Sequence, residues 1–273
     1  MILPSEIAAA GYRLWALDET GSTNQDAMNA GRSGDPGMLW VTAREQKAGR
    51  GRHGRTWSSP AGNLYASLLL VDPCDLAVAP QLGFVAGLAL HDAVSSVTGT
   101  VWPDLALKWP NDLLLGGAKV SGLLLEAQVV SPEKLAIVIG FGVNVAEAPS
   151  NTHYRAAALM EVNSTASPEA LFCGLTDAFD RYFTAWRSVR ASGSDAFSPV
   201  REAWLARAAA LGQEVGIRIG SRRLTGVFVG LDPVGRLLLE TGEGLETIDA
   251  GDLFWPSLSC SSDASQSSDE VLP

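Results

Sequence analysis

Four strand-like segments follow one another between residues 105 and 145, and this run limits the possible folds more than any other feature. They cover residues 105–109, 112–115, 119–129 and 134–145, and Gly116-Gly117 forms a hairpin turn between two of them. Three earlier segments, residues 12–17, 38–42 and 63–71, also have strand character. The pattern predicts a β-sheet that most of the chain contributes to.

Helices are expected on either side of the run of strands. Ser22 or Thr23 can cap a short helix that ends near Ala30, and an apolar helix begins at Pro80 and runs to Val97. A third helix begins at Ser167, with apolar residues at helical spacing, and a fourth covers residues 198–211. The fold class is therefore α+β.

The pattern changes after Gln213, where short strands and glycine-rich turns replace the helices. The expected strands are residues 215–219, 222–231, 236–240 and 245–249, the size of a small SH3-like β-barrel. Residues 257–273 contain seven serines in 17 positions and few large apolar groups, so a disordered tail is predicted there. The expected domains are residues 1–211, 212–256 and 257–273.

Composition narrows the class of protein. Of the 273 residues, 47% are hydrophobic and 18% charged, as in globular soluble proteins, and the net charge of −10 argues against broad nucleic-acid binding. The three cysteines are widely spaced and form neither a zinc pattern nor a disulfide framework. No secretory signal and no bilayer-spanning segment is visible, so a cytoplasmic protein without a membrane partner is predicted.

Against this acidic background, residues 44–55, which we call the cationic loop, stand out. The segment reads Arg-Glu-Gln-Lys-Ala-Gly-Arg-Gly-Arg-His-Gly-Arg and holds five of the 20 Lys and Arg residues. Glycine allows backbone N–H groups to approach a ligand, and the arginine guanidinium matches carboxylate and phosphate oxygens. Such a loop predicts an anion site, although a lone segment of this kind is also typical of a solvated surface loop.

Three further segments change that balance. Gly21-Ser22-Thr23-Asn24-Gln25 lies at a strand-to-helix junction, and Leu107-Lys108-Trp109-Pro110-Asn111-Asp112 is followed by Lys119 and Gly122. Ile139-Gly140-Phe141-Gly142-Val143-Asn144 ends the run of strands, and the cationic loop itself continues to Trp57. Each segment alone has an ordinary structural interpretation, but the four in this order do not.

In this order the four segments resemble the biotin–protein ligases, densely from about Ser22 to Asn144 and more weakly through the C-terminal strands. The resemblance implies a mixed sheet flanked by helices, related to class II aminoacyl-tRNA synthetases. It implies that biotin's carboxylate attacks the α-phosphate of ATP, with Mg²⁺, to form biotinyl-5'-AMP. A lysine of a biotin carboxyl carrier protein domain then accepts the biotin. Such a ligase acts as a monomer or homodimer.

The first step brings two anions together, so cations must stabilise the developing charge. The catalytic candidates are Lys119, Arg50 and Arg52. By resemblance, the biotin-binding residues are Ser22, Thr23, Asn24, Gln46, Gly49, Arg50, Trp57, Lys119 and Gly122. The nucleotide-binding residues are Arg50, Arg52, Trp57, Asn111, Asp112, Lys119 and Asn144. Asp112 is interpreted as a partner of Arg52 or as a ligand that helps to place Mg²⁺.

The sequence departs from the family pattern in two places. About 20 residues precede Ser22, too few for a winged helix-turn-helix, so no sequence-specific DNA partner is predicted. Residues 156–159 read Ala-Ala-Ala-Leu where relatives carry Thr-Ser or an aromatic residue, which leaves Tyr154 as the candidate to cover adenine.

Three other functions stay open at this stage: a lipoyl or octanoyl transferase or ligase of the same fold, a biotin or nucleotide sensor without activity, and a nucleic-acid-binding module.

Overall fold

A computed structural model describes residues 1–132 and 134–255 of the chain. They form two compact units, Met1–Ala209 with Pro233–Gly235, and Ala210–Asp232 with the residues from Arg236 onward. The predicted tail, residues 257–273, lies outside the described residues. Within the described part, no helix is both long and apolar enough to cross a membrane.

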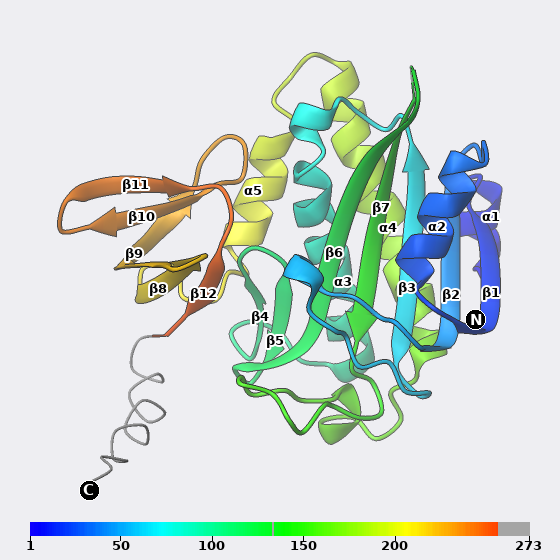
Figure 1. The fold of residues 1–273 in the computed structure, drawn as a ribbon, viewed down its shortest axis with the longest axis horizontal. Helices are drawn as coiled ribbons and strands as arrows, with labels where there is room; N and C mark the ends of the chain where they lie inside the picture. Colours follow the sequence, from blue (N-terminus) through cyan, green and yellow to red (C-terminus); the bar gives the residue numbers. More distant parts are fainter. Residues whose placement is uncertain (133, 256–273) are drawn as a thin grey trace, which may run out of the picture. The chain divides into compact units, whose positions relative to one another are not determined.

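The first unit is built on a seven-stranded sheet in the order β1-β2-β3-β7-β6-β5-β4 (Figure 1). β1 and β2 are parallel and the remaining neighbours are antiparallel, which confirms the expected mixed sheet. The strands are β1 (Arg13–Thr20), β2 (Leu39–Gln46), β3 (Leu64–Val71), β4 (Leu105–Lys108), β5 (Asp112–Leu115), β6 (Ala118–Ser131) and β7 (Lys134–Val143).

Helices cover both faces of this sheet (Figure 1). α2 (Thr23–Arg32) lies on one face, against β2, β3 and β7, while α3 (Gln81–Thr98) and α4 (Pro168–Ala191) pack together on the other. The remaining helical segments are α1 (Ser5–Ala9), α5 (Phe197–Leu205) and the 3₁₀ turns η1 (Arg52–Gly54), η2 (Leu76–Val78) and η3 (Leu159–Glu161). The sequence analysis did not identify α1.

α5 is shorter than the helix expected over residues 198–211. After Leu205 the backbone turns to β4, where Leu107 N–H donates to Arg207 C=O and Ala209 N–H donates to Leu107 C=O. These bonds to a strand replace the next helical turn, so the helix ends early.

Successive side chains of a strand point to opposite faces of the sheet, so the first unit has one apolar core on each face. Leu39 and Val41 of β2 point toward α2 and pack with Ala27 and Met28. Trp40, between them, points to the opposite face, where its ring lies 5.5 Å from Phe172 of α4. Because the period of a strand is two, residues of β3, β6 and β7 can likewise be assigned to one face.

The second unit contains a five-stranded antiparallel sheet in the order β11-β10-β9-β8-β12. Its strands are β8 (Glu214–Ile219), β9 (Arg222–Leu231), β10 (Leu237–Thr241), β11 (Gly244–Ile248) and β12 (Asp252–Phe254). The four expected strands are present, and β12 is added to them. The structure thus has a separate small β-module, which the sequence analysis expected as a barrel.

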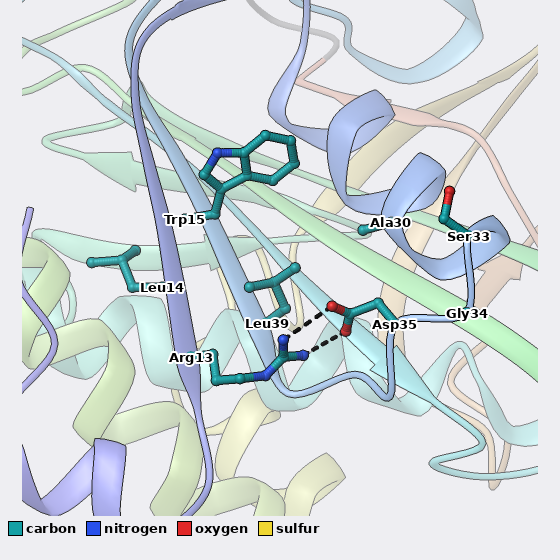
Figure 2. Close-up of a pocket in the computed structure, with 8 residues that line it drawn as sticks. All are labelled: Arg13, Leu14, Trp15, Ala30, Ser33, Gly34, Asp35 and Leu39. Atoms are coloured by element: carbon teal, nitrogen blue, oxygen red, sulfur yellow. Dashed lines mark hydrogen bonds and ion pairs between the residues drawn. The ribbon is translucent and has the colours of Figure 1, made fainter.

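An open hollow of about 710 Å³ lies beside β1 (Figure 2). Its two charged side chains, Arg13 and Asp35, bind each other through two hydrogen bonds, and leucine, alanine and tryptophan supply much of the lining. None of the residues that the sequence analysis assigned to ligands lines it. The hollow is therefore separate from the predicted site.

Asp92 of α3 connects this helix to α4 on the face of the sheet opposite α2. It accepts hydrogen bonds from Tyr182 at 2.9 Å and Arg181 at 3.2 Å, and Arg207 lies 3.6 Å away. Burial alone would raise its pKa, but the nearby His91 ring, the hydrogen bonds from Tyr182 and Arg181 and the charge of Arg207 lower the pKa to about 2.

We predict that Asp92→Asn lowers the free energy of unfolding by about 2 kcal/mol at pH 7. Because the folded-state pKa lies below the ordinary value, this stabilisation is complete above about pH 5 and is lost as the pH falls through about 2. Urea unfolding of both proteins between pH 7 and pH 3 measures it. A difference that stays constant or grows toward low pH would contradict the prediction.

Candidate active site

The floor of the site is a glycine-lined part of the sheet face that carries α2. Gly140 and Gly142 of β7 point to this face, and Gly122 of β6 pairs directly with Gly142. A Cβ on Gly140 would overlap the Asn24 amide, and one on Gly142 would lie 2.6 Å from the Trp57 ring. These positions lack side chains because Asn24 and Trp57 occupy the space above them.

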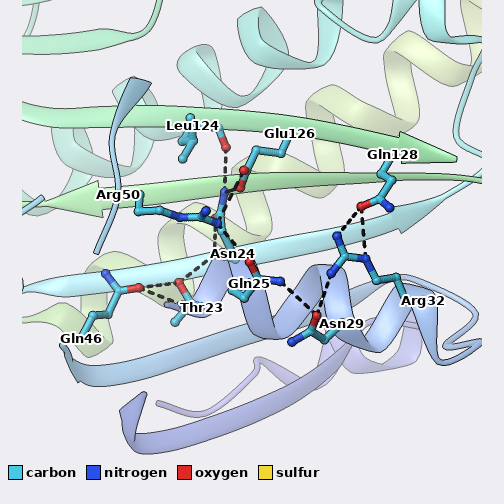
Figure 3. A network of polar contacts seen from close by, with 11 residues as sticks. Thr23, Asn24, Gln25, Asn29, Arg32, Gln46, Arg50, Leu124, Glu126 and Gln128 are labelled. Carbon is cyan, nitrogen blue, oxygen red and sulfur yellow. Dashed lines mark hydrogen bonds and ion pairs between the residues drawn. The ribbon is translucent and has the colours of Figure 1, made fainter. Parts of the chain in front are cut away.

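The N-terminus of α2 places three polar residues on this floor. Ser22, Thr23 and Asn24 are 7%, 3% and 5% exposed, although all three are polar. Ser22 precedes the helix in extended conformation without a side-chain capping bond. Thr23 and Asn24 instead point across to β2, β3 and β6, where they enter a buried polar network (Figure 3).

The network runs from Glu126 to Gln46, the last residue of β2. Asn24 Nδ2 donates to Glu126 at 2.8 Å, and Ser67 Oγ lies 2.6 Å from Asn24 Oδ1 and 2.8 Å from Thr23 Oγ1. Gln46 Oε1 accepts from the Thr23 backbone N–H at 2.9 Å, and Thr23 Oγ1 lies 3.1 Å from the same oxygen.

Gln46 connects this network to Ser59 and, through Ser59, to the backbone of Trp57. Its Nε2 donates to Ser59 Oγ, and Ser59 donates to the Trp57 carbonyl, both at 3.0 Å.

This network presents acceptor oxygens. The Asn24 and Gln46 amide groups turn their oxygens toward Ser67 and Thr23, because their nitrogens donate elsewhere. Asn24 Oδ1 accepts from Ser67 Oγ, and Gln46 Oε1 accepts from the Thr23 backbone N–H, so both oxygens have a donor within the protein. An amide oxygen has two lone pairs, so Asn24 Oδ1 can accept a further hydrogen bond from an N–H group of a ligand.

The cationic loop leaves β2 and returns as a tight turn. Gly51 N–H donates to Arg55 C=O and Trp57 N–H donates to Gly49 C=O. His53 and Gly54 at its tip have φ of 57° and 72°, a region in which glycine is favoured. Gly49 has no room for a side chain, because a Cβ would lie 2.5 Å from Ser59 Oγ. The turn brings Trp57 onto the glycine floor.

Lys119 and Arg52 form a cationic end of the site. Lys119 Nζ lies 2.6 Å from Asp112 Oδ1, and the Lys119 side chain is 19% exposed. The Trp57 and Tyr154 rings lie 5.5 and 5.3 Å from the same nitrogen, within the range of cation–π attraction. Asp112 is thus an ion-pair partner of Lys119.

Asn111 holds Arg52 at this end. Its Oδ1 accepts from Arg52 at 3.2 Å, and its Nδ2 donates to the Leu123 carbonyl of β6. The Lys-Trp-Pro-Asn-Asp segment therefore contributes one residue to each cation, as its position between β4 and β5 allows.

Arg50 belongs to the other end of the site. Its guanidinium lies 3.6 Å from Glu126 and 3.4 Å from Gln25 Oε1 (Figure 3). The structure thus brings Lys119 and Arg52 to the cationic end of the site. Arg50 lies at the opposite end, where the Glu126 carboxylate beside Asn24 is its partner.

Asn144 fixes the segment that passes Lys119. Its Nδ2 donates to the Ala157 carbonyl at 3.2 Å, and its own backbone N–H donates to Val120 C=O. Ala156 pairs with Lys119 through an isolated β-bridge. This connection places Tyr154 against Lys119.

Four residues of the site were not identified in the sequence analysis: Ser59, Asn63, Ser67 and Glu126. Ser67 is completely buried, and Asn63 Oδ1 accepts from the backbone N–H groups of residues 145, 146 and 147. Ser67 could have been identified from the sequence, because it is the one serine in the otherwise largely apolar strand Leu64–Val71. Glu126 could also have been identified, because it lies four residues after Gly122 in the same strand and therefore on the same face of the sheet.

Among the residues that the structure describes, no group of three His, Cys, Asp or Glu side chains is placed to hold a metal ion. Asp112, the carboxylate at the anion end, contacts Lys119.

Comparison with known proteins gives a consistent result. Residues 19–144 match the biotin/lipoate A/B protein ligase family, and residues 210–254 match the biotin protein ligase C terminal domain. A biotin–[acetyl-CoA-carboxylase] ligase of Paracoccus denitrificans is 40% identical, with 88% of this chain and 99% of the relative covered. The bifunctional ligase/repressor BirA of Bacillus subtilis is 30% identical, with 89% of this chain and 74% of the relative covered.

A solved structure is also similar. The biotin protein ligase of Aquifex aeolicus, in complex with biotin and ATP, matches with a TM-score of 0.73 at 30% identity. The match covers 89% of this chain and 97% of that one.

We predict that Gly140→Ala lowers the free energy of unfolding by about 1–3 kcal/mol, because the added methyl group must displace the buried Asn24 amide. Gly83→Ala in α3 is the matched control, since its Cβ meets open space and helical alanine is favourable by up to about 1 kcal/mol. Urea unfolding of the two variants checks this. Equal stability of the Gly140→Ala variant and the parent would show that Asn24 does not occupy that space.

Proposed function

This chain belongs to the biotin/lipoate A/B protein ligase family, and from that premise we propose that it joins biotin to a lysine of a biotin carboxyl carrier domain. In the first step a biotin carboxylate oxygen attacks the α-phosphorus of ATP, and the bond to the pyrophosphate leaving group breaks. In the second step the lysine amine attacks the carbonyl carbon of biotinyl-5'-AMP, loses a proton and releases AMP.

The observation that carries the proposal is the pairing of a neutral end with a cationic end on one glycine floor. The neutral end presents acceptor oxygens at Asn24, Thr23 and Gln46, and the cyclic urea of biotin has two N–H donors. The cationic end holds Lys119 and Arg52. Gly140 and Gly142 are two residues apart, about 7 Å along a strand, which suits biotin's pentanoate arm. The partly buried Trp57 ring would cover that arm.

The neutral end also distinguishes biotin from the acids used by lipoate ligases. A dithiolane ring or an octanoyl chain has no N–H group to offer the network. Either ligand would lack the hydrogen bonds that the biotin N–H groups can donate, each of which contributes about 0.5–1.5 kcal/mol. This favours biotin over the alternative substrates of the same fold.

Lys119 is proposed to contact both reacting anions. Its charge is held at one place by Asp112 and by two aromatic rings, so little reorganisation is needed when the phosphate charge develops. Arg52 is proposed to act on the phosphate side, where Asn111 holds it. We assign Ser22, Gly49 and Gly122 to biotin, and Asn144, Asn111, Asp112 and Tyr154 to the neighbourhood of the nucleotide.

Mg²⁺ enters the proposed reaction as part of the ATP substrate. Mg²⁺ bound to ATP keeps several waters and needs few protein carboxylates. Among the described residues, those around Asp112 do not form a cluster that could hold a resident metal ion.

Biotin-dependent exchange of labelled pyrophosphate into ATP tests the proposal, because it reports the first step without a carrier. Exchange that requires biotin is the expected result. ATP turnover that ignores biotin would refute it.

We predict that Lys119→Ala slows this exchange by about 10²–10³-fold, the usual effect of removing one contact to developing charge. Lys134→Ala, a change at an exposed lysine of β7, is the control and should exchange at the parent rate. Circular dichroism confirms that both variants are folded. A Lys119→Ala rate within threefold of the parent would remove Lys119 from the reaction.

We predict that Arg52→Gly releases biotinyl-5'-AMP into solvent, because the variant loses both the guanidinium and its link to Asn111. The free mixed anhydride then acylates lysines on bystander proteins. Biotinylation of added serum albumin, read by streptavidin blot, measures the leak. The control is Arg44→Ala, whose parent side chain is 76% exposed; leakage equal to that of the control would contradict the role of Arg52.

A further inference from the structure

Glu126 of β6 is the point where two separate parts of the site meet. Its Oε2 accepts from Asn24 Nδ2 at 2.8 Å, and its Oε1 lies 3.6 Å from Arg50 Nη2 (Figure 3). Asn24 belongs to α2 and Arg50 to the cationic loop. One carboxylate therefore touches both the neutral end and the base of the loop.

The sheet register explains why a carboxylate stands there. Glu126 pairs with Val138, which belongs to the apolar cluster under α2, so its side chain points to the face of the site. It is 34% exposed. A carboxylate beside an apolar cluster is costly unless it is paired, and Asn24 and Arg50 provide the pairing.

Glu126 determines which way the Asn24 amide points. An ionised carboxylate only accepts hydrogen bonds, so the Asn24 nitrogen must face it and the Asn24 oxygen must face Ser67. A second Nδ2 contact, to the Leu124 carbonyl at 3.3 Å, agrees with this orientation. Were the amide reversed, Asn24 would present N–H donors at the neutral end in place of an acceptor.

Glu126 also anchors the cationic loop. Arg50 is held between Glu126 and Gln25, and it pairs through an isolated β-bridge with Thr56 on the returning side of the loop. Residues 50 and 56 thus form the base of the turn that carries Arg52. Fixing Arg50 fixes that base.

We propose that Glu126 is a positioning residue with two effects: it orients the Asn24 amide toward the biotin ring, and it anchors the cationic loop through Arg50. The first effect rests on the proposed function. The second does not, because it concerns the protein without ligand.

Three substitutions separate the two effects. Glu126→Gln keeps an oxygen that can accept from Asn24 but loses the charge that holds Arg50. Arg50→Gln loses the same ion pair from its other side and leaves Glu126 with Asn24. Glu126→Ala removes both contacts.

Hydrogen exchange of the amides of residues 49–57 in ligand-free protein measures whether the Glu126–Arg50 ion pair restrains the cationic loop. Because both side chains are partly exposed, the ion pair should slow exchange by about fivefold. Glu126→Gln, Arg50→Gln and the double variant should all lose this protection to the same extent. Unchanged exchange in Glu126→Gln, or additive losses in the double variant, would overturn the anchor.

Pyrophosphate exchange reads the orientation of Asn24. The KM for biotin should rise about tenfold in Glu126→Ala relative to Glu126→Gln, while the KM for ATP stays within twofold between the two. A general loss of structure would change both constants. Equal biotin KM values in the two variants would overturn the orienting role.

A matched control and a separate readout complete the test. Glu246→Gln breaks an ion pair with Arg222 in the second unit and should leave the loop exchange and both KM values unchanged. If the parent protein shows no biotin-dependent exchange, the proposed function fails, but hydrogen exchange still decides whether Glu126 anchors the loop.

Discussion

The site depends on three glycines, Gly122 of β6 and Gly140 and Gly142 of β7, which leave one part of the sheet face without side chains. The N-terminus of α2 and the Trp57 ring lie so close to Gly140 and Gly142 that no side chain fits between them and the sheet. Two segments far apart in the sequence, the start of α2 and the end of the cationic loop, are thereby brought onto one floor. The three glycines are part of the binding geometry because they allow this close approach.

The bare floor makes a buried polar network necessary. Thr23, Asn24 and Ser67 are removed from water, so each must find partners within the protein. The amides of Asn24 and Gln46 turn their oxygens toward the hydroxyl groups, so this end of the site presents acceptors. Acceptors of this kind suit a neutral N–H donor, while Lys119 and Arg52 suit negative charge at the other end of the site.

Strand alternation and motif spacing are local properties, so the sequence predicted the strands, the α+β class and the segments that meet at the site, while the mixed sheet followed from the family resemblance. It did not predict Ser67 or Glu126, whose roles follow from the register between strands that are distant in the chain. The partner of Arg50 was missed for the same reason. α5 ended early because Leu107 of β4 binds the backbone after it, a tertiary contact that helix propensity does not contain.

The central claim is that the neutral end selects the acid that is activated. Mass spectrometry of the purified protein, incubated with ATP and equal amounts of biotin, lipoate and octanoate, tests this most directly. Each hydrogen bond from a biotin N–H group to the neutral end contributes about 0.5–1.5 kcal/mol, so two of them favour biotin over an acid without a donor by about 10–100-fold. We therefore expect biotinyl-5'-AMP as the acyl adenylate that is detected. Lipoyl or octanoyl adenylate in comparable amount would contradict the account.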